Sequence, residues 1–180
     1  MSNLAVYITI AVSGLQTLLI VLTLIYTRYH FKLERAASYI ARFNSEDMIK
    51  NRAAVERWLS RPVSECKRLS ELEEDPELMI RIFTFINIFQ EVGVGYRNKM
   101  VHRRSTESYY GHLIISYWDR TRFLIEWRRE VVGRPTLYED FQYAAERFAR
   151  KRKRPGHSSS PATGLAVQRA ALFRSSQTED

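Results

Sequence analysis

Residues 4–26 read LAVYITIAVSGLQTLLIVLTLIY, and no Asp, Glu, Lys, Arg or His interrupts the run. A helix rises about 1.5 Å per residue, so a run of this length can cross a bilayer hydrocarbon core of about 30 Å. We therefore interpret residues 4–27 as a transmembrane helix. The rest of the chain is then a polar body held at a membrane.

The charges on the two sides of the run predict its orientation. Residues 1–3 carry no charged side chain, whereas Arg28, Lys32, Arg35 and Arg42 follow the run. Lys and Arg accumulate on the cytoplasmic side of membrane proteins. We expect a single-pass protein of the inner or plasma membrane, with residues 1–3 outside and the body in the cytoplasm. A cleaved signal peptide is the alternative, but it needs a basic start, a shorter apolar core and a small-residue cleavage site, which are absent.

Two features of the run concern its contacts in the membrane. Tyrosine and basic side chains suit the headgroup level. The residues expected at this interface are Tyr26, Arg28, Tyr29 and Lys32. Ala5, Thr9 and Ser13 recur every four residues on one face, where small side chains let two membrane helices approach. This face predicts a homodimer, although the same residue types are ordinary in membrane helices.

Composition bounds the chemistry of the body. The chain has 180 residues, a net charge of +8 and a single cysteine, Cys66, which agrees with a reducing cytoplasm. No metal-ligand spacing, phosphate-binding glycine loop or nucleophile elbow occurs in the sequence. We therefore expect no metal, no cofactor and, on balance, no enzymatic activity.

The fold class predicted for the body is all-α, because helical spacing recurs along it and no run alternates with the period of a strand. A juxtamembrane helix over residues 28–44 continues the membrane span, and a cytosolic helical bundle follows over residues 45–154. The segments expected to be helical in the bundle are residues 46–59, a brief stretch within 63–74, and residues 76–96, 106–131 and 138–154. Residues 155–180 have the small, polar composition of a disordered tail.

Local signals mark the helix ends. Asn44 or Ser45 is expected to cap the helix that ends near residue 59. Asp75 should cap the next long helix, with Pro76 at its first position. Gly133 stands in a Gly-Arg-Pro sequence that should break the chain between the last two helices.

The segment 76–96 is the most apolar part of the body. Its apolar residues cover most of a helix circumference, which is typical of a helix in the middle of a bundle. A second membrane span is the alternative, but Arg81 and Glu91 would be costly in lipid. Gly93 and Gly95 are expected to loosen the end of this helix.

The order of these features resembles a bacterial family classed as a domain of unknown function, whose members have one N-terminal span and a cytosolic all-helical domain. The similarity lies in RAASYIARFNSEDMIKNRAAVERWL (35–59), FQEVGVGYRN (89–98), YYGHLIISYWDRTRFLIEWRRE (109–130) and LYEDFQYAAERF (137–148). The resemblance implies this architecture and no particular activity.

One constellation is similar to a catalytic motif. Arg97 and His102 are separated by four residues, as in the HEPN-type ribonucleases, all-helical domains in which Arg and His pair across a dimer. An Arg can hold a phosphodiester and a His can transfer a ribose proton. This chain continues with RRST, where that family usually has a Gly and an aromatic residue. The alternative is a basic loop that faces solvent or lipid.

Basic residues also gather near the C-terminus. The cluster consists of Arg150, Lys151, Arg152, Lys153 and Arg154. Anionic lipid is one candidate partner, because basic residues near an acidic leaflet gain about 1 kcal/mol each. Nucleic acid is not expected, since no aromatic residues are interleaved for base stacking. A solvated helix end is the third interpretation.

The sequence favours a protein-interaction or regulatory module at the inner face of the membrane, with an unknown protein partner. Its interaction surface is expected to include the basic loop 97–104 and the aromatic residues Tyr109, Tyr110 and Trp118. The alternatives are a membrane-tethered HEPN-like ribonuclease and an RNA- or lipid-binding module that uses the basic cluster.

Overall fold

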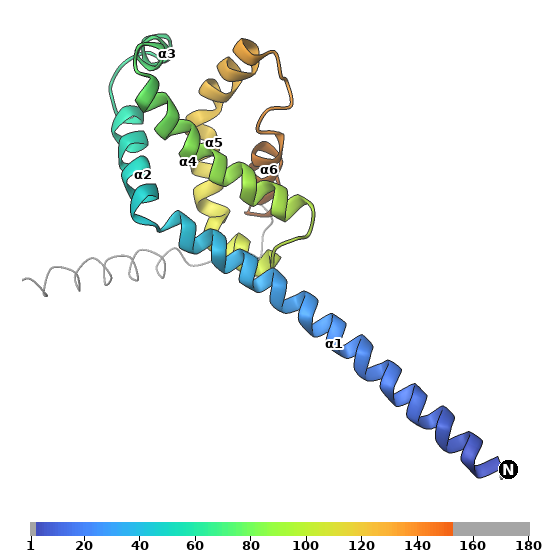
Figure 1. Ribbon diagram of the computed structural model, residues 1–180. Helices are drawn as coiled ribbons and strands as arrows, with labels where there is room; N and C mark the ends of the chain where they lie inside the picture. Colours follow the sequence, from blue (N-terminus) through green and yellow to red (C-terminus); the bar gives the residue numbers. More distant parts are fainter. Residues whose placement is uncertain (1–2, 153–180) are drawn as a thin grey trace, which may run out of the picture. The chain divides into compact units, whose positions relative to one another are not determined.

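A computed structural model describes residues 3–152 of the protein, and for residues 3–6 and 9 the backbone alone. This part of the chain is all-helical and contains no strand, which confirms the predicted fold class. The helices, drawn in Figure 1, are α1 (Asn3–Phe43), α2 (Glu46–Leu59), α3 (Glu65–Glu74), α4 (Pro76–Arg97), α5 (Arg103–Val132) and α6 (Glu139–Arg152). The predicted tail, residues 155–180, lies outside the described residues.

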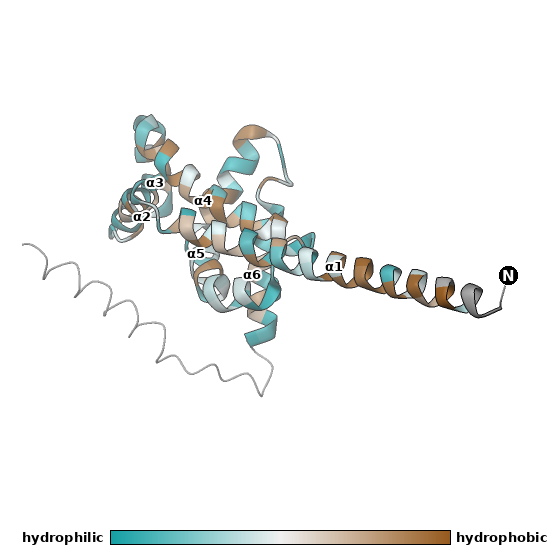
Figure 2. Cartoon of the chain, turned by 60° about the horizontal axis from the view of Figure 1, so that its bottom comes forward, coloured by the Kyte–Doolittle hydropathy of each residue, from teal (hydrophilic) through white to brown (hydrophobic). Residues whose placement is uncertain are grey.

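Helix α1 runs without a break from the apolar run into the bundle, so no helix end marks the predicted boundary between residues 27 and 28. The side chains described between Tyr7 and Phe31 are all exposed, whereas Ala36 and Phe43 are buried. Figure 2 shows the corresponding change from mainly hydrophobic residues to a mixture along α1. Residues 10–43 form a helix long and apolar enough to cross a membrane, and none of its most apolar window is buried.

Helix α4 is the centre of the bundle, as its sequence predicts. It contacts α1, α2, α3 and α5. It also has the length and composition of a membrane span, but half of its apolar window is buried inside the protein. Ile82, Phe85 and Val92 are completely buried there. The Asp75 carboxylate accepts a hydrogen bond from the backbone N–H of Leu78 at 2.9 Å, so the predicted cap is confirmed.

Aromatic packing around Phe89 joins four helices. The Phe89 ring lies 5.9 Å from Phe43 of α1, 5.2 Å from Tyr117 of α5 and 5.2 Å from Phe141 of α6, measured between ring centroids. Such pairs contribute about 0.5–1.5 kcal/mol each beyond the burial of their area. Phe89 therefore anchors the three helices that surround the end of α4.

The link between α1 and α2 differs from the prediction that Asn44 or Ser45 caps α2. Ser45 occupies the N-cap position, but its hydroxyl donates to the Arg42 carbonyl at 2.8 Å instead of accepting from α2. The Asn44 amide donates to the Ile40 carbonyl at 2.9 Å. Because the link is so short, both side chains serve the open carbonyls at the end of α1.

The last two helices follow the predicted order with small shifts. Helix α5 begins at Arg103, three residues before the predicted start, and α6 begins at Glu139. Gly133 ends α5 in the left-handed conformation, with φ of 68°, as its Gly-Arg-Pro context predicts. Phe141 and Phe148 of α6 are buried in the core. Residues 149–152 complete α6, and Arg150, Lys151 and Arg152 are exposed at its end.

Candidate functional site

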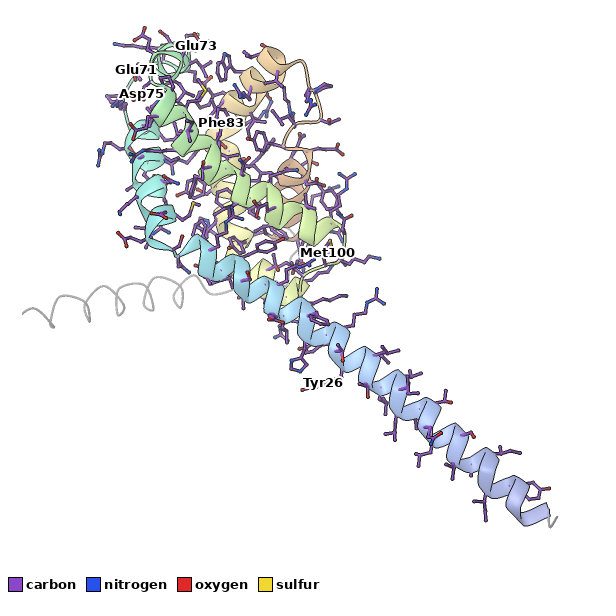
Figure 3. All side chains as sticks on the ribbon, viewed as in Figure 1. Tyr26, Glu71, Glu73, Asp75, Phe83 and Met100 are labelled. Atoms are coloured by element: carbon purple, nitrogen blue, oxygen red, sulfur yellow. The ribbon has the colours of Figure 1, made fainter. Side chains whose placement is uncertain are left out.

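The candidate site is the junction, which we define as residues 26–35 of α1 together with residues 97–105 that connect α4 to α5. It contains the predicted interface residues and both residues of the ribonuclease hypothesis. Figure 3 labels Tyr26 on α1 and Met100 at the end of α4 that lies beside α1.

The predicted interface residues lie on exposed turns of α1 next to the bundle. The Tyr26 ring lies 4.1 Å from the His30 ring, and the Tyr29 ring meets the His102 ring edge-on at 5.4 Å. Tyr29 is 49% exposed and Tyr26 is 64% exposed. Tyr29 therefore contributes to the attachment of the bundle to α1 while half of its surface stays open.

His102 joins α5 to α1 through its backbone and its ring. Its backbone N–H donates to the Lys32 carbonyl at 3.0 Å. Its Nδ1 accepts from the backbone N–H of Ser105 at 3.4 Å and lies 2.8 Å from the Ser105 hydroxyl. Nδ1 thus occupies the position of an N-cap acceptor, which explains why α5 starts earlier than predicted.

Arg97 is held by carboxylates of α6. Its guanidinium donates to Glu139 at 2.8 Å and to Asp140 at 3.0 Å, and it lies over the Tyr143 ring at 5.4 Å. The hydrogen bonds to Glu139 and Asp140 raise the pKa of Arg97. The group that the ribonuclease hypothesis assigns to a phosphate is therefore paired with two negative charges, while His102 contacts other partners.

The glycines near the end of α4 allow close packing, which corrects the prediction that they loosen the helix. A Cβ atom at Gly93 would lie 2.3 Å from the backbone oxygen of Asp140 in α6. Gln90 stabilises the contact between α4 and α6, because its amide donates to the Asp140 carboxylate at 3.1 Å and accepts from the Phe141 N–H at 3.0 Å. At Gly95 a Cβ atom would meet Val101 at 3.0 Å. Helix α4 therefore stays regular as far as Arg97.

A groove of about 560 Å³ lies on the open side of the junction. Its walls come from α1 and from the connection after α4. The residues that line it are Arg28, Phe31, Lys32, Glu34, Arg35, Ser38, Asn98, Lys99 and Met100. It is the part of the junction where basic side chains from distant parts of the sequence come together.

A second polar cluster, which none of the sequence patterns indicates, joins α2 to α5. Arg120 donates to both carboxylate oxygens of Glu56 at 2.9 Å, and the Tyr117 hydroxyl donates to the same carboxylate at 2.5 Å. Burial raises the pKa of Glu56, but the hydrogen bonds from Arg120 and Tyr117 and the charge of Arg120 outweigh it and leave the pKa lowered. No local pattern predicts this cluster, because its members are about sixty residues apart.

A known protein family matches most of the chain. The family model for DUF4760, a domain of unknown function, matches residues 8–148. The chain belongs to this family. No curated protein and no solved structure matches the chain. The family of unknown function that the sequence resembles is therefore confirmed, and the match includes both the apolar half of α1 and the bundle.

For this DUF4760 domain, the prediction that Tyr110 and Trp118 belong to an interaction surface is wrong. Tyr110 is 1% exposed and Trp118 is 9% exposed, so both belong to the core. The Tyr110 hydroxyl donates to the Tyr39 carbonyl of α1 at 2.7 Å, and burial raises the pKa of Tyr110. Tyr109 is half-buried and hydrogen-bonds to Asn44. The physical reason is that α5 passes between α1, α4 and α6, which leaves little of its aromatic face open.

The remaining predicted site residues belong to the end of α6 and to the apolar half of α1. Arg150, Lys151 and Arg152 lie exposed at the end of α6, whereas Lys153 and Arg154 lie outside the described residues. The side chains of Ala5 and Thr9 also lie outside the description, and Ser13 is exposed on α1. Within the described residues, no group of three or more His, Cys, Asp or Glu side chains could hold a metal ion.

Proposed function

We propose that this protein is a single-span membrane protein whose helical bundle lies in the cytoplasm and acts as a protein-interaction or regulatory module at the inner face of the membrane. One observation carries the proposal: a single helix, α1, joins an apolar half, whose described side chains are exposed, to a half that is packed into the bundle.

The exposure of the first half of α1 supports a membrane environment. Soluble proteins rarely expose contiguous apolar surface beyond a few hundred Å², because it is costly in water. Large apolar side chains remain open along this segment, including Leu19 at 55%, Leu24 at 64% and Ile25 at 62%. A bilayer removes this cost for all of them together. The basic residues that follow favour the cytoplasm for the bundle.

Charged groups of the bundle hold its helices together. Arg42 pairs with Glu91, Arg97 with Glu139, and Arg120 with Glu56, and each pair joins two helices. Arg97 thus joins α4 to α6 and His102 joins the start of α5 to α1, and we propose no catalytic role for them. The HEPN-like ribonuclease and the basic cluster of residues 150–154 stay predictions from sequence.

Self-association is part of the proposal. The face formed by Ala5, Thr9 and Ser13 would let two spans approach closely, and the bundle of each copy would then lie at the same membrane surface. Replacing Thr9 and Ser13 by Leu is expected to weaken the dimer in a membrane two-hybrid assay, whereas replacing Leu18 and Leu22 by Ala should leave it intact.

The topology can be tested with the cysteine that the chain already has. Cys66 is exposed on α3, and the sequence contains no other cysteine. In intact cells a membrane-impermeant maleimide is expected to leave Cys66 unlabelled, and permeabilisation should expose it. The matched control is the double variant Cys66→Ser, Ser2→Cys, which should be labelled in intact cells. Labelling of Cys66 in intact cells, or extraction of the protein by alkaline carbonate, would refute the proposal.

A further inference from the structure

If α1 spans a membrane as proposed, the groove at the junction lies at the level of the lipid headgroups. The groove begins at Arg28, two residues after the apolar run ends, and its basic residues on α1 extend to Arg35. Seven residues of helix rise about 10 Å. The headgroup layer on each side of the hydrocarbon core is about 5–8 Å thick. An upright α1 therefore places Arg28 within the headgroup layer, Lys32 near its outer edge and Arg35 beyond it, and none of them in the hydrocarbon.

The charge of the groove suits an anion. Arg28, Lys32, Arg35 and Lys99 line it with four positive charges against the single negative charge of Glu34. Among the residues that the structure describes, no salt bridge involves any of these five side chains. Many arginines of the bundle, in contrast, are paired with carboxylates. The groove therefore keeps its charge available to a ligand.

The wall that carries Lys99 is held firmly against α1. Lys99 itself has a left-handed backbone, with φ of 57°. The Met100 N–H donates to the Gly95 carbonyl at 2.8 Å, and the His102 N–H donates to the Lys32 carbonyl at 3.0 Å. Val101, between them, is 1% exposed. These contacts are all made within the chain and fix the wall that carries Lys99, so an occupant of the groove needs little further ordering of it.

Two exposed apolar side chains border the basic ones. Phe31 on α1 is 65% exposed, and Met100 on the opposite wall is 44% exposed. Apolar side chains next to basic ones are typical of surfaces that enter the boundary between headgroups and acyl chains. Both neighbours thus favour a lipid over a soluble anion.

From these observations we propose that the groove binds the phosphate-bearing headgroup of an anionic phospholipid in the cytoplasmic leaflet. Arg28, Lys32 and Lys99 contact the phosphate, and Phe31 and Met100 border it. This inference rests on the proposed membrane anchoring, and it assigns to the junction a lipid selectivity that anchoring alone does not provide.

The test uses the full chain reconstituted in phosphatidylcholine vesicles with trace spin-labelled lipid. The motionally restricted fraction in the electron paramagnetic resonance spectrum gives the relative association of phosphatidylglycerol and phosphatidylcholine. We expect phosphatidylglycerol to be preferred. Lys32→Gln and Lys99→Gln should each lower that preference about fivefold, which corresponds to about 1 kcal/mol per basic residue. The control variants Arg57→Gln and Lys67→Gln, which remove exposed charges of the bundle outside the groove, should leave it unchanged.

The Lys99 variant distinguishes a site in the groove from an effect of charge on α1 alone. Lys99 is 67 residues after Lys32 in sequence and shares only the groove with it. An effect of Lys32→Gln without an effect of Lys99→Gln would mean that charge on α1 acts alone, and would overturn the site. Equal association of both lipids with the wild-type chain would also overturn it. A chain that fails to float with vesicles refutes the anchoring and the site together, whereas one that floats without selectivity refutes the site only.

Discussion

Gly93 offers a sharp test of the contact between α4 and α6. Replacing a glycine inside an exposed helix by alanine normally stabilises the helix by about 1 kcal/mol. At Gly93 we expect the opposite sign, because the new Cβ would lie 2.3 Å from the backbone oxygen of Asp140. Gly111 of α5 is the matched control, since nothing lies within 4 Å of a Cβ placed there.

The size of the effect follows from the geometry. An ordinary contact begins at 3.4 Å, so α6 must retreat by about 1 Å. A gap of this size loses a quarter to a half of each dispersion contact along the interface. It also stretches the two hydrogen bonds of Gln90, each worth about 1 kcal/mol. Overpacking typically costs about 1–3 kcal/mol, the weakened Gln90 hydrogen bonds add up to about 2 kcal/mol, and the gain in helix propensity returns about 1 kcal/mol, so we expect Gly93→Ala to destabilise the bundle by about 2 kcal/mol.

Urea unfolding in detergent, followed by tryptophan fluorescence, measures this difference. All three tryptophans, Trp58, Trp118 and Trp127, lie in the bundle, so the signal reports bundle unfolding and not the apolar half of α1. Gly111→Ala should raise the free energy of unfolding by up to about 1 kcal/mol. The reasoning is refuted if Gly93→Ala is neutral or stabilises the protein as Gly111→Ala does.

Three further predictions use the same unfolding assay. Glu56→Gln should cost about 1 kcal/mol at neutral pH, because it breaks the bidentate pair with Arg120. The lowered pKa of Glu56 makes this stabilisation complete above about pH 4.5, and it is lost as the pH falls further, so a gap between wild type and variant that persists in strong acid would contradict it. Asp75→Ala should cost about 1 kcal/mol, whereas Ser45→Ala, which removes no hydrogen bond to the first turn of α2, should cost clearly less; equal losses would count against the cap geometry. His102→Ala should cost about 1 kcal/mol and His102→Asn, which keeps a capping oxygen, much less, and equally unstable variants would exclude the capping role.

Sequence patterns predict this fold well where the signal is local. Asp75 and Pro76 mark the start of α4, and Gly133 marks the end of α5, because capping and backbone conformation depend on a few neighbouring residues. The apolar circumference of α4 likewise predicts its central place. These features need no knowledge of the partners across the bundle.

The candidate site was harder to predict, because its contacts are distant in sequence. Arg97 has the spacing of a catalytic residue, but its carboxylate partners stand 42 and 43 residues later. His102 caps a helix although histidine is rarely read as a cap. Trp118 has the composition of an interaction surface and is buried, since an aromatic helix face does not reveal whether the protein or a partner covers it.

The continuity of α1 couples rotation as well as position. The helix contains no proline, and its only glycine, Gly14, lies far from the bundle, so it has none of the usual causes of a kink near the junction. Each residue turns the helix by about 100°. One residue inserted between Tyr26 and Lys32 would therefore swing the bundle through more than a quarter turn relative to the apolar half. A rotation of either half about the helix axis is therefore transmitted to the other half through the continuous helix.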